Sequence, residues 1–181
     1  MGDSLDKHIG FQSIVKTYGW KDLLKDSFAP ILLASFVTIS AIIYSDDSHA
    51  LFDKVVALCS SILPSYLGLL VAAYTLLLTL LTTKTVSALK EIVDDLNNYS
   101  GKDLLRTLNS DFAVCILVAG FALFLSVLFS ICSSLNIVFL YADVVNFLGI
   151  FVMVYLLFYS LTILFNLIED LYNIGQTTII L

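Results

Sequence analysis

Charged residues are scarce in this chain of 181 residues. Asp, Glu, Lys and Arg together make up 13% of it, whereas 59% of its residues are hydrophobic. A soluble domain is usually about 25% charged and about 45–50% apolar. So few charges do not cover the surface of a soluble protein, and the composition therefore predicts a membrane protein that forms one domain over residues 1–181.

Residues that bind metals or carry out catalysis are also few. Cys59, Cys115 and Cys132 lie in apolar segments without C-x-x-C spacing, and the two histidines lie far apart. A zinc site needs a closer group of ligands, so we interpret the cysteines as small buried residues. With no catalytic or nucleotide-binding motif, we expect no enzyme, metal or cofactor. The net charge of −6 and the lack of a basic patch argue against direct nucleic-acid binding.

Four long runs without a charged residue are present instead. They contain 18, 29, 31 and 25 residues and extend over 28–45, 55–83, 112–142 and 144–168. A membrane-spanning helix needs roughly 20 apolar residues, so each run can cross a bilayer once. The fold class is therefore predicted as all-α, an integral membrane four-helix bundle. The predicted spans are about 28–45, 64–83, 112–136 and 144–167.

The second run is too long for one straight span, and it contains Pro64. Proline removes a backbone donor and disfavours a helical conformation at the preceding residue. We therefore predict a break near Leu63, with a short interfacial helix over 49–62 and a span that starts at Pro64. A continuous helix with a kink is the alternative.

Lysine and arginine indicate the orientation of the spans. Four precede the first span and four lie between the second and third, whereas one, Lys54, lies between the first and second and none lies elsewhere. Cytoplasmic loops carry the excess of positive charge. We therefore expect a multi-pass membrane protein with both termini in the cytoplasm. Residues 1–26 are amphipathic and are expected on the cytoplasmic or interfacial side.

Residues 84–111 are the longest polar stretch between spans and predict a cytoplasmic helical hairpin. The second span is expected to continue inward as a helix, because apolar residues recur there at helical spacing, namely Val86, Leu89, Val93 and Leu96. A turn cluster fills 98–101, and Ser100 or Asp103 suits the cap of the next helix. This hairpin is the largest feature offered to the cytoplasm. Its charges and an acidic pair after the fourth span are candidate contacts for a soluble partner: Glu91, Asp94, Asp95, Lys102, Arg106, Glu169 and Asp170.

Small or polar residues recur every three or four positions within the spans, and no ionisable residue lies in their middles. The absence of mid-membrane charge argues against a transporter or an intramembrane protease. Stripes of small residues let helix backbones approach closely, so we interpret them as helix-packing faces, with the lining of a pore in an oligomer as the alternative. The candidates for packing or pore lining are Gly68, Ala72, Thr75, Thr79, Ser126, Ser130, Tyr155, Tyr159 and Asn166.

The stretch Leu63-Pro64-Ser65-Tyr66-Leu67-Gly68, followed by Ala72-Ala73-Tyr74-Thr75, resembles the proline-led span of small four-span membrane proteins encoded in bacterial anti-phage defence loci. Within that group, the chain resembles the membrane subunit of the Kiwa system in size, span count and topology. The resemblance covers the whole chain in layout and about a dozen residues in motif. It implies a homo-oligomer in the bacterial inner (cell) membrane that senses disturbance of the membrane and works with a soluble cytoplasmic protein.

Two hypotheses of function follow. The first is a non-enzymatic oligomeric membrane subunit that senses or relays a membrane signal to a soluble cytoplasmic partner, in anti-phage defence. The second is a pore-forming effector whose oligomer depolarises the inner membrane.

Overall fold

Four long helices dominate the structure, a computed structural model that describes residues 20–80, 93–94, 99–134 and 141–180. All four are long and apolar enough to cross a membrane, with mean hydropathies of 1.9, 2.0, 2.8 and 2.3 in chain order. This confirms the prediction of a helical protein with four candidate spans. The elements are α2 (Trp20–Tyr44), α3 (Ser48–Leu80), β1 (Val93–Asp94), β2 (Tyr99–Ser100), α5 (Gly101–Ser134) and α6 (Ala142–Ile180).

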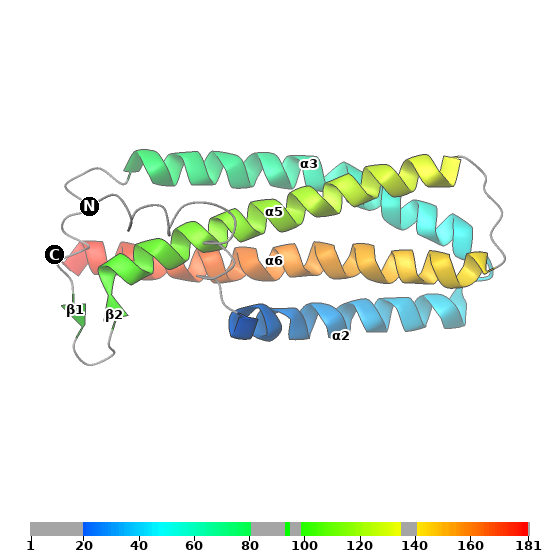
Figure 1. The fold of residues 1–181 in the computed structure, drawn as a ribbon, viewed down its shortest axis with the longest axis horizontal. Coiled ribbons are helices and arrows are strands. Elements are labelled where there is room, and N and C mark those ends of the chain that lie inside the picture. The colour runs from blue at the N-terminus through cyan, green and yellow to red at the C-terminus, as the bar shows by residue number, and fades with distance from the viewer. Residues whose placement is uncertain (1–19, 81–92, 95–98, 135–140, 181) are drawn as a thin grey trace, which may run out of the picture.

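The last helix, α6, occupies the middle of the bundle. It packs against the other three helices, with α2 on one side and α3 and α5 on the other, and α2 makes little contact with α3 (Figure 1). The end of the bundle that contains Ser45–Asp47, between α2 and α3, is here named the turn end. The opposite end, with β1 and β2, is named the hairpin end.

Helix α3 continues through Pro64, so the predicted break near Leu63 is wrong. Pro64 cannot donate a backbone hydrogen bond to Ser60, and Figure 1 shows that α3 bends along its length. The residues on both sides of Pro64 nevertheless pack into the bundle, because Leu63 and Cys59 are buried against Ala122 and other residues of α5 and α6. Tertiary packing therefore maintains the helix where local preference favoured its end.

The hairpin end differs in part from the predicted helical hairpin. Val93 and Asp94 form a short strand that pairs antiparallel with Ser100 and Tyr99, so the expectation that Val93 continues a helix is wrong. Pairing between the two strands gives these backbone groups their partners in place of helical bonds. The second helix of the hairpin is confirmed, because α5 begins at Gly101 and continues into the third span. Residues 84–92 and 95–98 lie outside the described residues.

The bundle core is made of apolar side chains in successive layers between the helices. Near the turn end Phe52 packs against Ile150 and Val154, and near the hairpin end Phe112 packs against Leu108 and Leu167. Cys59 and Cys115 are buried as expected, whereas Cys132 is exposed, contrary to the prediction. Cys132 lies in the last turn of α5.

Gly149 marks the closest approach of α6 to the Phe52 ring. A Cβ atom at this position would lie 2.5 Å from Cε2 of Phe52 and 3.2 Å from two further ring atoms. That ring is held in place by an edge-on contact with Phe129, at 5.5 Å between centroids. Position 149 therefore requires glycine because any larger side chain would clash with the Phe52 ring, and not because of its backbone conformation.

The change Gly149→Ala is expected to lower the free energy of unfolding by about 1–3 kcal/mol, because the new methyl group overpacks the contact with Phe52. Thermal unfolding of the detergent-solubilised protein measures the effect. Gly120→Ala is the control, since a Cβ there meets nothing within 4 Å. Adding Phe52→Leu to Gly149→Ala should recover part of the loss. Equal stability of the two alanine variants would contradict the proposed clash.

Candidate functional site

Polar side chains join α3 to α6 at the turn end. Ser48 donates a hydrogen bond of 2.5 Å to Oδ1 of Asp143, and Nδ2 of Asn146 donates one of 3.1 Å to Ser48 Oγ. Both helices begin here, and Asp143 in the first turn of α6 interacts favourably with the helix dipole. Asp47 accepts a 3.0 Å bond from the amide of Ala50 and so caps α3. These bonds hold the first turns of the two helices together.

A second polar group joins α3 to α5 at the same end. Ser133 donates a hydrogen bond of 2.5 Å to Oδ1 of Asp53, and Nδ1 of His49 lies 3.2 Å from the other carboxylate oxygen. His49 and Asp53 are one helical turn apart on α3 and are about half exposed. The Asp53 carboxylate thus holds both the serine and the imidazole in fixed orientations.

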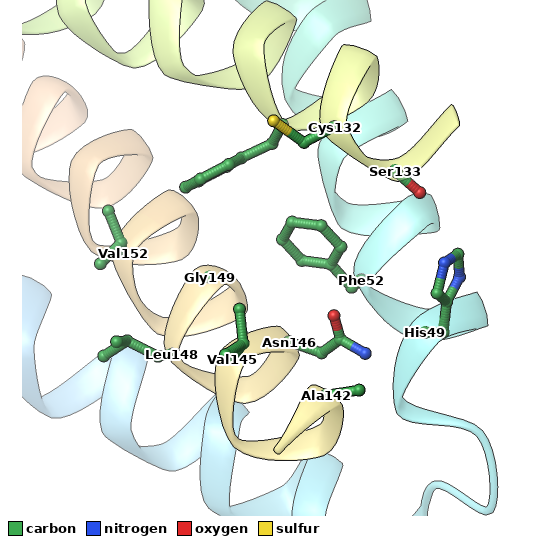
Figure 2. A pocket seen from close by; sticks show the side chains of 11 residues that line it. His49, Phe52, Cys132, Ser133, Ala142, Val145, Asn146, Leu148, Gly149 and Val152 are labelled. Carbon is green, nitrogen blue, oxygen red and sulfur yellow. The ribbon is translucent and has the colours of Figure 1, made fainter. Parts of the chain in front are cut away.

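A pocket of about 340 Å³ opens beside these groups, between α3, α5 and α6 (Figure 2). Its polar lining residues are His49, Ser133 and Asn146, all close to the turn end. Its apolar lining comes from the next turns of the same helices and includes Phe52, Phe129, Leu148 and Val152. A second hollow of about 380 Å³ shares His49 and Ser133 and is lined also by Asp53, Ser130 and Ser134.

The sequence reasoning did not identify this site. The spacing of His49 and Asp53, four residues apart, is a signal that the sequence carries, because such residues share one face of a helix. The contributions of Ser133 and Asn146 depend on how α5 and α6 pack against α3. Among the described residues, no three His, Cys, Asp or Glu side chains lie close enough together to hold a metal ion.

The polar stripe of α6 points into the bundle. The Tyr155 ring stacks between those of Phe151 and Tyr159, at centroid distances of 6.4 and 5.7 Å, and its hydroxyl lies 3.1 Å from Ser27 Oγ. Tyr159 is 5% exposed. Asn166, two turns further along, is partly buried. Tyr155 and Tyr159 thus lie between helices of this chain rather than on an open surface.

The small residues of α5 also lie within the bundle over most of the stripe. Ala119, Ala122 and Ser126 are fully buried, whereas Ser130 is exposed. Ser126 forms a hydrogen bond with Ser60 on α3 and donates a 3.4 Å bond to the Val56 carbonyl. This part of the stripe lets α5 and α3 approach closely.

The small residues of α3 are placed differently. Gly68, Ala72, Thr75 and Thr79 are all exposed, and a Cβ at Gly68 would meet nothing within 4 Å. The hydroxyls of the two threonines donate to carbonyls of their own helix at 2.8 and 2.7 Å. Within the part of the chain that the structure describes, this face of α3 is therefore not covered by another helix.

The candidate partner-binding charges belong to the hairpin end. Asp94 lies in β1, and Glu169 is exposed near the end of the apolar part of α6. Asp170 is partly buried, and its side chain hydrogen-bonds with that of Asp111 on α5. Asp111 is 7% exposed and lies directly before the buried Phe112 on α5. It was not among the residues predicted to bind a partner. Glu91 and Asp95 lie outside the described residues, as do the side chains of Lys102 and Arg106.

The pair Ser126 and Ser130 provides a test of how the α5 stripe packs. Ser126→Leu is expected to lower the free energy of unfolding by about 1–3 kcal/mol, because the larger side chain forces α5 away from α3. Ser130→Leu, one turn along on the exposed side, should change it by less than about 0.5 kcal/mol. Unfolding of both variants in the same detergent measures the difference, and similar losses would refute the packing seen here.

No known protein family, curated protein or solved structure matches this chain. What the protein does is therefore inferred from the arrangement of its own residues.

Proposed function

We propose that this chain is a non-enzymatic membrane subunit that forms a homo-oligomer and relays a signal from the membrane to a soluble cytoplasmic partner. The four apolar helices support a multi-pass membrane protein. The distribution of lysine and arginine supports cytoplasmic termini. The resemblance to bacterial proteins supports a location in the inner membrane. The resemblance to four-span proteins of anti-phage defence loci supports a role in such a system.

The observation that carries the proposal is the outward face of α3. Lipid-facing surfaces of the other helices present large side chains, such as Phe28 and Phe36 on α2 and Phe124 on α5. The face of α3 with Gly68 and Ala72 instead presents small ones to the outside. In lipid, small residues favour close helix contact, and here the partner helix comes from a second copy of the chain.

The contacts of this face favour packing over a pore. Thr75 and Thr79 bond to the backbone of their own helix, which satisfies their hydroxyls without water. Leu69 and Leu76 are exposed on the same half of α3, and such side chains suit contact with apolar surfaces. The pore-forming effector is the alternative function, and the experiments below distinguish it from the signal relay.

The hairpin end supplies the surface for the soluble partner. The strand pair β1–β2, which contains Asp94, lies at the same end of the bundle as the C-terminal part of α6 (Figure 1). That part of α6 carries the exposed Glu169. A basic partner surface complements these carboxylates, because opposite charges speed and orient association. Oligomerisation through α3 then brings several such surfaces together.

The oligomer is tested by Ala72→Leu. This change is expected to convert the oligomer to monomers, because the longer side chain holds the neighbouring helix away from Gly68. Native mass spectrometry from a mild detergent measures the mass of the complex. Ala29→Leu, a change of the same size at an exposed position of α2, is the control and should leave the mass unchanged. A wild-type monomer, or an oligomer indifferent to Ala72→Leu, would overturn the proposed interface.

The partner is tested by pull-down with the proteins encoded beside this one in its native locus. Replacing residues 93–100 with a Gly-Ser linker leaves α5 intact and is expected to abolish capture of a stoichiometric soluble protein. Asp94→Lys should also weaken capture of the soluble protein, because it reverses the charge at this position. Conductance of planar bilayers is measured in parallel. Ion flux by the wild type without any bound partner would support the pore-forming effector instead.

A further inference from the structure

We infer that the pocket between α3, α5 and α6 at the turn end binds a lipid of the surrounding bilayer whose headgroup donates hydrogen bonds. This site is independent of the proposed oligomer and partner. Its volume of about 340 Å³ falls within the range of roughly 300–1,000 Å³ usual for small-molecule sites. A pocket of that size accommodates a substantial part of a lipid molecule.

The polar residues of the lining lie near the turn end, and the lining residues farthest from that end are apolar. His49 and Ser133 lie in the terminal turns of α3 and α5, and Asn146 is the fifth residue of α6. Phe129 lies more than one turn before the end of α5. Val152 lies more than two turns into α6 (Figure 2). A lipid bound with its headgroup at the turn end and its chain along Phe129 and Val152 matches this gradient. The polar groups then meet the headgroup without being transferred into an apolar environment.

The surroundings of the pocket favour a molecule that comes from the bilayer. Val145 and Leu148 belong to the lining and are themselves 50% and 62% exposed, on a helix apolar enough to span a membrane. These side chains face hydrocarbon when α6 is in a membrane. A lipid therefore reaches the pocket laterally, without passing through water.

The polar atoms of the lining accept hydrogen bonds. Asn146 donates through its nitrogen to Ser48, and its oxygen points toward Phe52 and the pocket (Figure 2). His49 faces Asp53 through Nδ1, and an imidazole that is neutral with its proton on Nδ1 offers Nε2 as an acceptor. The Asn146 oxygen and such an Nε2 both favour a ligand that supplies donors.

Charge adds to this preference. The carboxylates of Asp53 and Asp143 stand beside the polar end of the pocket, and no Lys or Arg is among the described residues that line it. A primary ammonium headgroup both donates hydrogen bonds and carries the complementary charge. Phosphatidylethanolamine has that group, whereas phosphatidylcholine has the same backbone and chains without a donor.

Cys132 provides the readout, because it lines the pocket and is the exposed cysteine, whereas Cys59 and Cys115 are buried. The full chain is reconstituted in nanodiscs of phosphatidylcholine alone, or of phosphatidylcholine and phosphatidylethanolamine with matched acyl chains. The rate of maleimide labelling of Cys132 is expected to fall by about fivefold with phosphatidylethanolamine, the effect of one net hydrogen bond. A Cys132→Ala variant gives the background rate.

Variants separate binding from a general effect of the bilayer. Asn146→Leu removes one acceptor and should abolish the difference between the two lipids. His49→Ala, at a side chain 53% exposed and therefore harmless to folding, should reduce it. Ser134→Ala lies at the same end of α5 outside this pocket and should leave the difference unchanged.

Three outcomes overturn the proposal. Labelling rates that are equal in the two lipids remove the headgroup preference. A difference that survives in both Asn146→Leu and His49→Ala places its origin outside the pocket. Protection by added decylamine, without protection by phosphatidylethanolamine, assigns the pocket to a soluble amphiphile instead of a bilayer lipid.

Discussion

Lipid offers no hydrogen-bond partner, so a polar group within an apolar helix is stabilised by a partner inside the protein. Hydroxyls achieve this in two ways. Thr75 and Ser160 bond to the carbonyl four residues earlier in their own helix, at 2.8 Å each. Tyr66 on α3 reaches across the bundle and donates a 2.7 Å bond to the Ser160 carbonyl on α6. The second kind of bond ties helices together, and its positions determine which faces turn inward.

The central place of α6 follows from such contacts. Tyr155 approaches Ser27 on α2, while Ser160 receives Tyr66 from α3, so opposite sides of one helix carry partners from different neighbours. Because α2 packs on α6 and scarcely touches α3, one side of α3 is left for the outside of the bundle. The central position of α6 thereby accounts for the uncovered small residues on α3.

Helix α3 connects the two proposals. Its first turns carry His49 and Phe52, which line the pocket at the turn end, and its second half carries Gly68 and Ala72 on the outward face. Pro64 separates these two parts within one continuous helix. The proposed lipid at one end and the proposed second subunit at the other would therefore act on the same helix, which would give a membrane signal a physical route to the assembly.

The sequence by itself determined that four helices are apolar enough to cross a membrane, because the length of a charge-free run is a local property. It also indicated that Tyr155 and Tyr159 share one face of a helix, either packed against other helices or lining a pore. Only the tertiary structure decided that α3 continues through Pro64, that the stripe of α5 packs inward while that of α3 faces out, and that His49, Ser133 and Asn146 meet at one pocket. These features depend on the choice of neighbours among helices of similar composition, and apolar periodicity does not distinguish one such neighbour from another.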